Sequence, residues 1–302
     1  MFDNEILQPF RIEGDKVLDQ HFDGLTSATI FSCTPNHLGK VLLEAWHVQT
    51  SIGKKIKENR ELKSAQKFYA KHRAHILFTL GFMSLPYCYA AAAGAQVMYF
   101  SDKMRNQPLK RLKDTASFVE SVCSPDSSVE SIDFSIRQVR WKHAQVRAFM
   151  KQQTFWNSDW GLPVNQEDLA GTNLAFSVVV LRGLRKLNIP VSPEEAAQFY
   201  LLWTIIGEAL GIEKLLLPSS LKQSLELEKA IKTRHFIKNE QSVWLTKSLV
   251  STLNKAMGFD QAEKIMGSML EPDVVEVLSL QPDSFDFIQQ TFIHTFLRWK
   301  SF

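Results

Sequence analysis

The sequence predicts an all-α protein folded as a single large helical domain. Apolar residues recur at three- and four-residue spacing along most of the chain, which is typical of amphipathic helices. No segment alternates apolar and polar residues between hairpin turns, and no fixed-period repeat indicates a solenoid. With 302 residues, 45% of them apolar, the chain is long enough to bury a sizeable core and too apolar to be disordered.

Composition excludes several classes of protein. Lys and Arg total 35 against 32 Asp and Glu, so the chain lacks the strong basic excess of a dedicated nucleic-acid binder. The three cysteines, Cys33, Cys88 and Cys123, form no Cys-x-x-Cys pair, which excludes a thiolate zinc site and fits a reducing compartment. The first five residues are acidic and no basic-then-apolar pattern follows, so we expect no secretory signal and a cytoplasmic location.

The first part of the chain, residues 1–74, is predicted to be a basic helical extension. Between residues 53 and 73, Lys and Arg recur at helical spacing, which indicates an exposed helix. A basic surface of this kind could contact an anionic membrane peripherally.

Residues 76–100 contain no charged side chain. As one helix they would extend roughly 37 Å, enough to cross a bilayer. Pro86 and Gly94 interrupt the segment, however, and this favours a buried hairpin or a kinked core helix. A membrane-anchored helical protein is kept as the alternative.

Three strong helices are expected in the central part of the chain. The first covers residues 131–151 after a turn at residues 124–128. The second covers residues 165–186, with Asn165 as its cap. The third begins at the capping box that starts with Ser192 and ends before Gly211. Further amphipathic helices should fill residues 216–302 and pack on this core.

His143 lies on the apolar face of the first of these helices, between Ile136 and Met150 at heptad spacing. A buried imidazole needs partners, so the simplest interpretation is a hydrogen-bonded core histidine. The alternative is a ligand to haem iron, for which a neutral imidazole is common. Arg140 and Arg147 on the same helix are either a solvated face or partners of acidic groups such as haem propionates.

Two further positions are candidates for chemistry. Arg111 and Thr115, four residues apart, either begin an exposed basic helix or share a face that points at a buried ligand. Thr172 is most simply satisfied by the backbone carbonyl one turn back. The nucleophile elbow, the dinucleotide-binding glycine motif, the P-loop and the His-Glu-x-x-His motif are all absent from the sequence.

The order of these pieces resembles the family of latex-clearing proteins and MpaB-type oxygenases, the rubber oxygenase catalytic domain. The resemblance covers roughly residues 75–215. It is carried by the segments Leu85-Pro86-Tyr87, Arg111 to Thr115 with Phe118, Val139-Arg140-x-x-His143-Ala144-x-Val146-Arg147, Gly161 to Leu169 with Thr172 and Phe176, Ser192 to Ala196, Trp203, and Ile206 to Ile212.

The resemblance implies a b-type haem in a helical fold with a globin-like core, formed here by residues 75–215. It implies that His143 is the proximal iron ligand and that Arg111 and Thr115 lie near the haem. With a haem at His143, we also expect Arg140, Arg147 and Thr172 to be cofactor-binding residues. The resemblance further implies an oxygenase that uses O2 on an apolar, possibly isoprenoid, small molecule. Asp114 stands where the rubber-cleaving branch has lysine, which favours the broader substrate class and leaves open a haem-binding protein without catalytic activity.

Overall fold

The computed structural model describes the chain except residues 1, 34–51, 101–107, 259 and 284–302. The described part is helical, with no strand and a single isolated backbone bridge between Ala91 and Phe236. Its α-helices are α1 (Asn4–Leu7), α2 (Ser27–Ile30), α4 (Ile52–Glu58), α5 (Arg60–Thr79), α6 (Leu85–Ala90), α7 (Ala92–Phe100), α9 (Pro108–Cys123), α10 (Val129–Lys151), α11 (Gln166–Lys186), α12 (Pro193–Ala209), α13 (Leu221–His235), α14 (Glu240–Met257), α15 (Ala262–Met269) and α16 (Pro272–Val277). The predicted all-α single domain is therefore confirmed.

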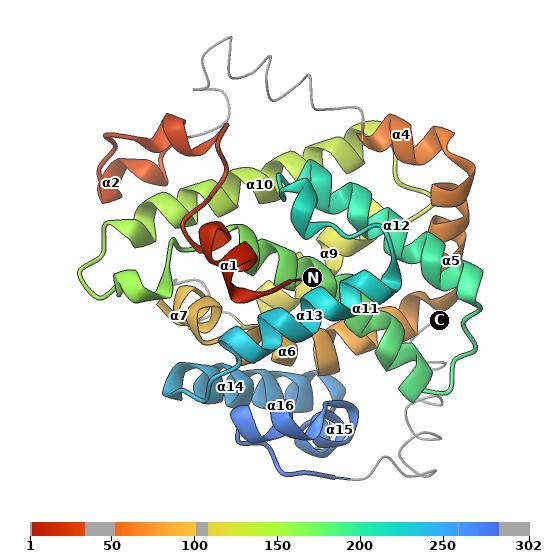
Figure 1. The fold of residues 1–302 in the computed structure, drawn as a ribbon. Coiled ribbons are helices and arrows are strands. Elements are labelled where there is room, and N and C mark those ends of the chain that lie inside the picture. Colours follow the sequence, from red (N-terminus) through yellow and green to blue (C-terminus); the bar gives the residue numbers. More distant parts are fainter. Residues whose placement is uncertain (1, 34–51, 101–107, 259, 284–302) are drawn as a thin grey trace.

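Helix α11 is the centre of the domain. In Figure 1 it runs through the middle of the molecule, with α10 above it and α14, α15 and α16 below it. Its side chains enter more than one hydrophobic cluster: Val179 packs with α6 and α14 to α16, whereas Val180 and Leu184 pack with α5, α9, α10 and α12. An apolar residue on nearly every face is what a helix buried on all sides requires.

The predicted caps explain where the central helices begin. The Asn165 side chain accepts the Asp168 backbone N–H at 2.9 Å and caps α11. At α12 both halves of the Ser192–Glu195 capping box are present. Gly211, just beyond the end of α12, has φ +84°, a conformation that suits glycine.

The uncharged segment at residues 76–100 lies in the core. A π-helical turn, Leu80–Ser84, separates α5 from α6, and all five of its residues are buried. Pro86 is the second residue of α6, directly after this turn. Within the described residues, no helix is both long and apolar enough to cross a membrane. The interrupted core segment favoured by the sequence is what the structure shows.

The expected boundary between an N-terminal extension and a core falls inside a helix. α5 begins at Arg60 and continues to Thr79, with one kink at His72 (φ −114°, ψ 15°). Its apolar face, which includes Leu62 and Phe68, packs in the same cluster as α12. The division between residues 74 and 75 therefore stays a prediction from the sequence, and in the structure α5 continues across it.

Gly183→Ala should measure how closely α5 and α11 approach. A Cβ at Gly183 would lie 2.2 Å from Thr79 Cγ2 and 3.2 Å from Met83 Sδ, so a buried side chain or the helix backbone would have to move. We expect a loss of about 1–3 kcal/mol in the free energy of unfolding. Urea denaturation measures it, and Gly94→Ala is the control, because Gly94 also lies within a helix and its Cβ would meet nothing closer than 3.9 Å. A Gly183→Ala loss no larger than that of the Gly94 variant would contradict the close approach.

Candidate functional site

His143 lies on α10, half-buried, and is not tied into the hydrogen-bond network of the core. Its Nδ1 is buried without a hydrogen-bond partner among the described residues. Burial lowers the pKa of the imidazole to about 4, and the positive charges of Arg147 and Arg111 act in the same direction. His143 is therefore neutral at pH 7, the form in which an imidazole binds a metal ion.

Arg111, on α9, lies near enough to His143 for its charge to lower the pKa of the imidazole, and it also contacts α7. Its Nη2 donates to the Sδ of Met98, at the end of α7, over 2.8 Å. Its charge also lowers the pKa values of Cys88 and Tyr89 on α6, although burial of both groups acts more strongly and raises them. α6, α7, α9 and α10 thus converge on one guanidinium. An apolar recess of about 10 Å³ ends there, lined by Leu85, Tyr89, Pro108, Arg111, Leu112, Leu245, Ser248 and Leu249.

The two threonines of the predicted site lie on different helices, Thr115 on α9 and Thr172 on α11. Thr115 is half-buried one turn further along α9 than Arg111, whereas its neighbour Asp114 is exposed. Thr172 on α11 donates its hydroxyl to the Asp168 carbonyl at 2.9 Å, as the sequence suggested, although the residue is exposed. It also forms a hydrogen bond with the Cys88 thiol, which places α11 beside the Arg111 neighbourhood.

Cys88 should be nearly inert to thiol reagents in the folded protein. Burial raises the pKa of its thiol to about 11, against the opposing effects of Arg111 and Thr172. We expect alkylation at pH 8 to be on the order of 100-fold slower than for an ordinary thiol, because the thiolate is the reactive form. Mass-spectrometric peptide mapping after timed iodoacetamide treatment measures this rate, and unfolding in urea should restore it. Rapid labelling without urea would contradict the burial.

Arg140 and Arg147, on the same helix as His143, are buried rather than solvated. The Arg140 guanidinium pairs with Asp15, with Nη2 and Oδ1 at 3.0 Å, and Arg147 Nη1 lies 2.9 Å from Asp19 Oδ1. Arg147 retains two buried nitrogens, Nε and Nη2, that find no hydrogen-bond partner in the described part of the chain. The sequence did not reveal these carboxylates, because they lie more than 120 residues away.

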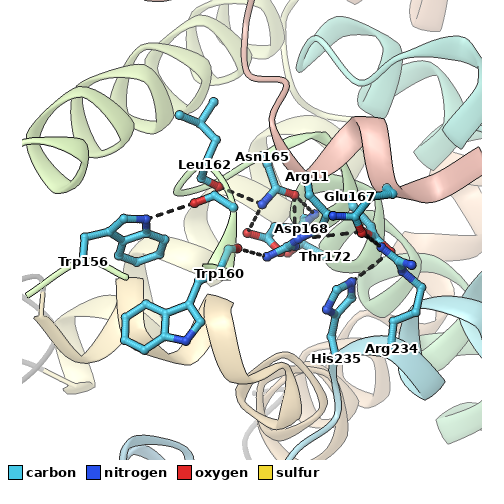
Figure 2. Close-up of polar contacts among 12 residues, drawn as sticks. Arg11, Trp156, Trp160, Leu162, Asn165, Glu167, Asp168, Thr172, Arg234 and His235 are labelled. Carbon is cyan, nitrogen blue, oxygen red and sulfur yellow. Dashed lines mark hydrogen bonds and ion pairs between the residues drawn. The ribbon is translucent and has the colours of Figure 1, made fainter. Parts of the chain in front are cut away.

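A second polar network fixes the loop before α11. Arg11 extends from the N-terminal segment to Asp168 Oδ1 at 2.5 Å, to Asn165 Oδ1 at 3.2 Å and to the Trp160 carbonyl (Figure 2). Gly161, at φ +78°, leaves no room for a Cβ, which would lie 2.5 Å from the Arg11 carbonyl oxygen. Glycine is therefore required at position 161, because the backbone at Arg11 lies too close for a side chain there.

Glu167, fully buried, joins this network to α13. Its Oε1 accepts the Arg234 Nε–H at 2.8 Å and lies 2.9 Å from His235 Nε2 (Figure 2). Burial by itself would raise the pKa of Glu167, but the hydrogen bonds to His235 and Arg234 outweigh it and hold the pKa below its ordinary value. The carboxylate is structural, since it ties α11 to α13.

The donor set excludes one kind of metal centre within the described residues. They contain no cluster of three or more His, Cys, Asp or Glu side chains that could hold a bare metal ion. A haem iron needs far less from the protein, because the porphyrin supplies four nitrogens and one imidazole suffices. His143 offers that one imidazole.

The geometry therefore defines an all-helical protein with a neutral imidazole near the half-buried guanidinium of Arg111, where several helices meet. The chain belongs to the family described as "ER-bound oxygenase mpaB/B'/Rubber oxygenase, catalytic domain", whose model matches residues 72–299. The resemblance found in the sequence is thereby confirmed.

A solved structure shares the fold. The structure of Latex Clearing Protein LCP in the closed state superposes with a TM-score of 0.74 at 15% sequence identity, covering 96% of this chain and 83% of the other. At that identity the likeness concerns the fold alone. No curated protein matches the chain by sequence.

Proposed function

We propose that this protein is a haem b-dependent oxygenase that uses O2 to oxidise or cleave an apolar, possibly isoprenoid, small molecule. Family membership supports the oxygenase class. The observation that carries the haem assignment is the neutral imidazole of His143, whose buried Nδ1 lacks a hydrogen-bond partner in the described region.

The residues present fit the cofactor. His143 would hold the iron, and Arg147, with two buried nitrogens unpartnered within the described residues, would bind a carboxylate of the porphyrin. Arg140 would add positive charge nearby, and Thr172 would contact the cofactor from α11. When bound, haem supplies the site for activating O2.

Arg111 and Thr115 are the proposed catalytic residues. A guanidinium that is half-buried in apolar surroundings is a fixed positive charge, so Arg111 would orient a polar group of bound oxygen or substrate. The Thr115 hydroxyl would add a hydrogen bond from the same face of α9. The apolar side chains of α6 and α14 that line the recess at Arg111 would exclude water and favour a hydrophobic substrate.

The test is a haemin titration of the purified protein, followed by oxygen-uptake assays with apolar alkenes and isoprenoids. We expect a Soret band at one haem per chain and substrate-dependent uptake. Haem binding without uptake by any such substrate would favour the non-catalytic haem protein, and the absence of a Soret band would exclude both.

Peripheral membrane contact by the basic segment at residues 53–73 is a separate proposal. Several of its charges are already paired in the structure: Lys71 lies 3.3 Å from Glu195 and Arg73 lies 2.7 Å from Glu120. Flotation with liposomes of neutral and of anionic lipid tests it, and an equal result for the two compositions would exclude an electrostatic contact.

A further inference from the structure

The segment Arg11–Phe22, called here the N-terminal strap, lies across α10 and the start of α11. The Arg11 carbonyl accepts the Leu162 N–H at 2.7 Å, and the Glu13 carbonyl accepts the Gln166 N–H at 2.9 Å. Further along the strap, Lys16 Nζ lies 3.0 Å from Glu213 Oε1. The strap is therefore fixed at several points by backbone and side chain together.

Two strap carboxylates contact the helix that bears His143. Asp15, only 4% exposed, meets the Arg140 guanidinium through both of its oxygens, a bidentate arrangement. The Asp15 carboxylate is itself held in place, since its Oδ1 also accepts the Leu18 N–H at 3.1 Å. Asp19 pairs with Arg147, and its Oδ2 accepts the Asp15 N–H at 2.9 Å.

These contacts lie on both sides of His143 along one face of α10. Arg140 precedes the histidine by three residues and Arg147 follows it by four, so all three side chains share that face. The packing leaves no slack: a Cβ at Gly14 would lie 2.6 Å from Arg147 Nε, and a Cβ at Gly211 would lie 3.0 Å from Arg140 Nε. A rotation of α10 about its axis would break both pairs.

We propose that Asp15 and Asp19 are positioning residues, which clamp Arg140 and Arg147 and thereby hold the His143 imidazole in the orientation that coordinates iron. The inference rests on the proposed role of His143. It goes beyond the family assignment, because the strap precedes residue 72, where the family match begins. The strap thus lies outside the family-matched residues and contacts a helix inside them.

The test compares full-length wild type with Asp19→Asn, Asp15→Asn and the double variant. Asp19→Glu keeps the charge, and Asp23→Asn removes an exposed carboxylate just beyond the strap as the matched control. Two measurements are made on protein shown to be folded by circular dichroism. One is the 15N NMR signals of the His143 imidazole in the haem-free chain, and the other is the haemin dissociation constant with the Soret position.

We expect the Asn variants to shift the His143 signals, to weaken haemin binding by about tenfold or more, and to move the Soret maximum. Asp23→Asn should match wild type in all three, and Asp19→Glu, which keeps the charge but lengthens the side chain, should lie closer to wild type than Asp19→Asn does. If the double variant does not fold, Asp19→Asn decides, since that carboxylate is the more exposed of the two.

Unchanged His143 signals and Soret maximum in folded Asn variants, with only a lower melting temperature, would overturn the positioning role. Failure of the wild type to bind haemin would refute the proposed function instead. In that case the NMR comparison in the haem-free chain would still decide whether the strap orients His143.

Discussion

His143→Ala is expected to abolish the Soret band that haemin produces with the wild-type protein. In the proposed site the porphyrin would supply four nitrogens to the iron, and the His143 imidazole would supply the bond from the protein. Its loss should weaken haemin binding by about 100-fold or more, beyond the effect typical of outer-sphere changes. Absorption titration with haemin measures both quantities.

The matched control is His75→Ala, which removes a half-buried imidazole on α5 inside the family-matched region. This variant should keep the wild-type Soret band. Equal bands in the His143→Ala variant and the wild type would remove His143 as the ligand. Loss of the band in both variants would indicate a folding defect instead.

Glu167→Gln should cause the largest loss of stability among single changes at the network of Figure 2. The substitution leaves Arg234 without its buried carboxylate, and removing one partner of a buried pair typically costs about 3–5 kcal/mol. Urea denaturation at pH 7 measures it. Glu226→Gln, an exposed position on α13, is the control and should change stability by less than about 0.5 kcal/mol.

The stability difference between wild type and Glu167→Gln should become smaller as the pH falls. The folded-state pKa of Glu167 lies below its ordinary value of 4.5, so the native protein binds fewer protons there than the unfolded chain. The contribution of Glu167 is full above pH 4.5 and is lost as the pH falls toward the folded-state pKa. The gap between wild type and variant should therefore narrow in acid, and a constant gap from pH 7 to pH 4 would contradict the assignment.

Local chemistry made the helices predictable. Asn165 and Ser192 are predicted as caps because their side chains accept N–H groups only three residues further along the chain. Both partners are therefore visible in the sequence. The interruption of the apolar segment by Pro86 likewise follows from one residue's missing donor. The π-helical turn Leu80–Ser84, just before Pro86, has no comparable signal in the sequence.

The sequence could not predict which carboxylates pair with the buried arginines, and the reason is physical. Which carboxylate meets Arg140 depends on how the strap crosses α10, and no periodicity of either segment encodes that crossing. The face of α10 could be predicted, since His143, Arg140 and Arg147 share it, but not that the face would be closed by Asp15 and Asp19. For the same reason, the contacts of Glu167 with α13 could not be predicted from the sequence.

The strap has a practical consequence for how a smaller piece of this protein would behave. A recombinant fragment that begins at residue 72 would retain α6, α7, α9 and α10 around Arg111. It would lose Asp15 and Asp19, the carboxylates that pair with the buried guanidinium groups of Arg140 and Arg147. In the fragment, these two guanidinium groups would need water or anions from the solution as hydrogen-bond partners. Such a fragment should aggregate or bind sulfate and phosphate avidly, whereas the longer polypeptide carries its own neutralising groups.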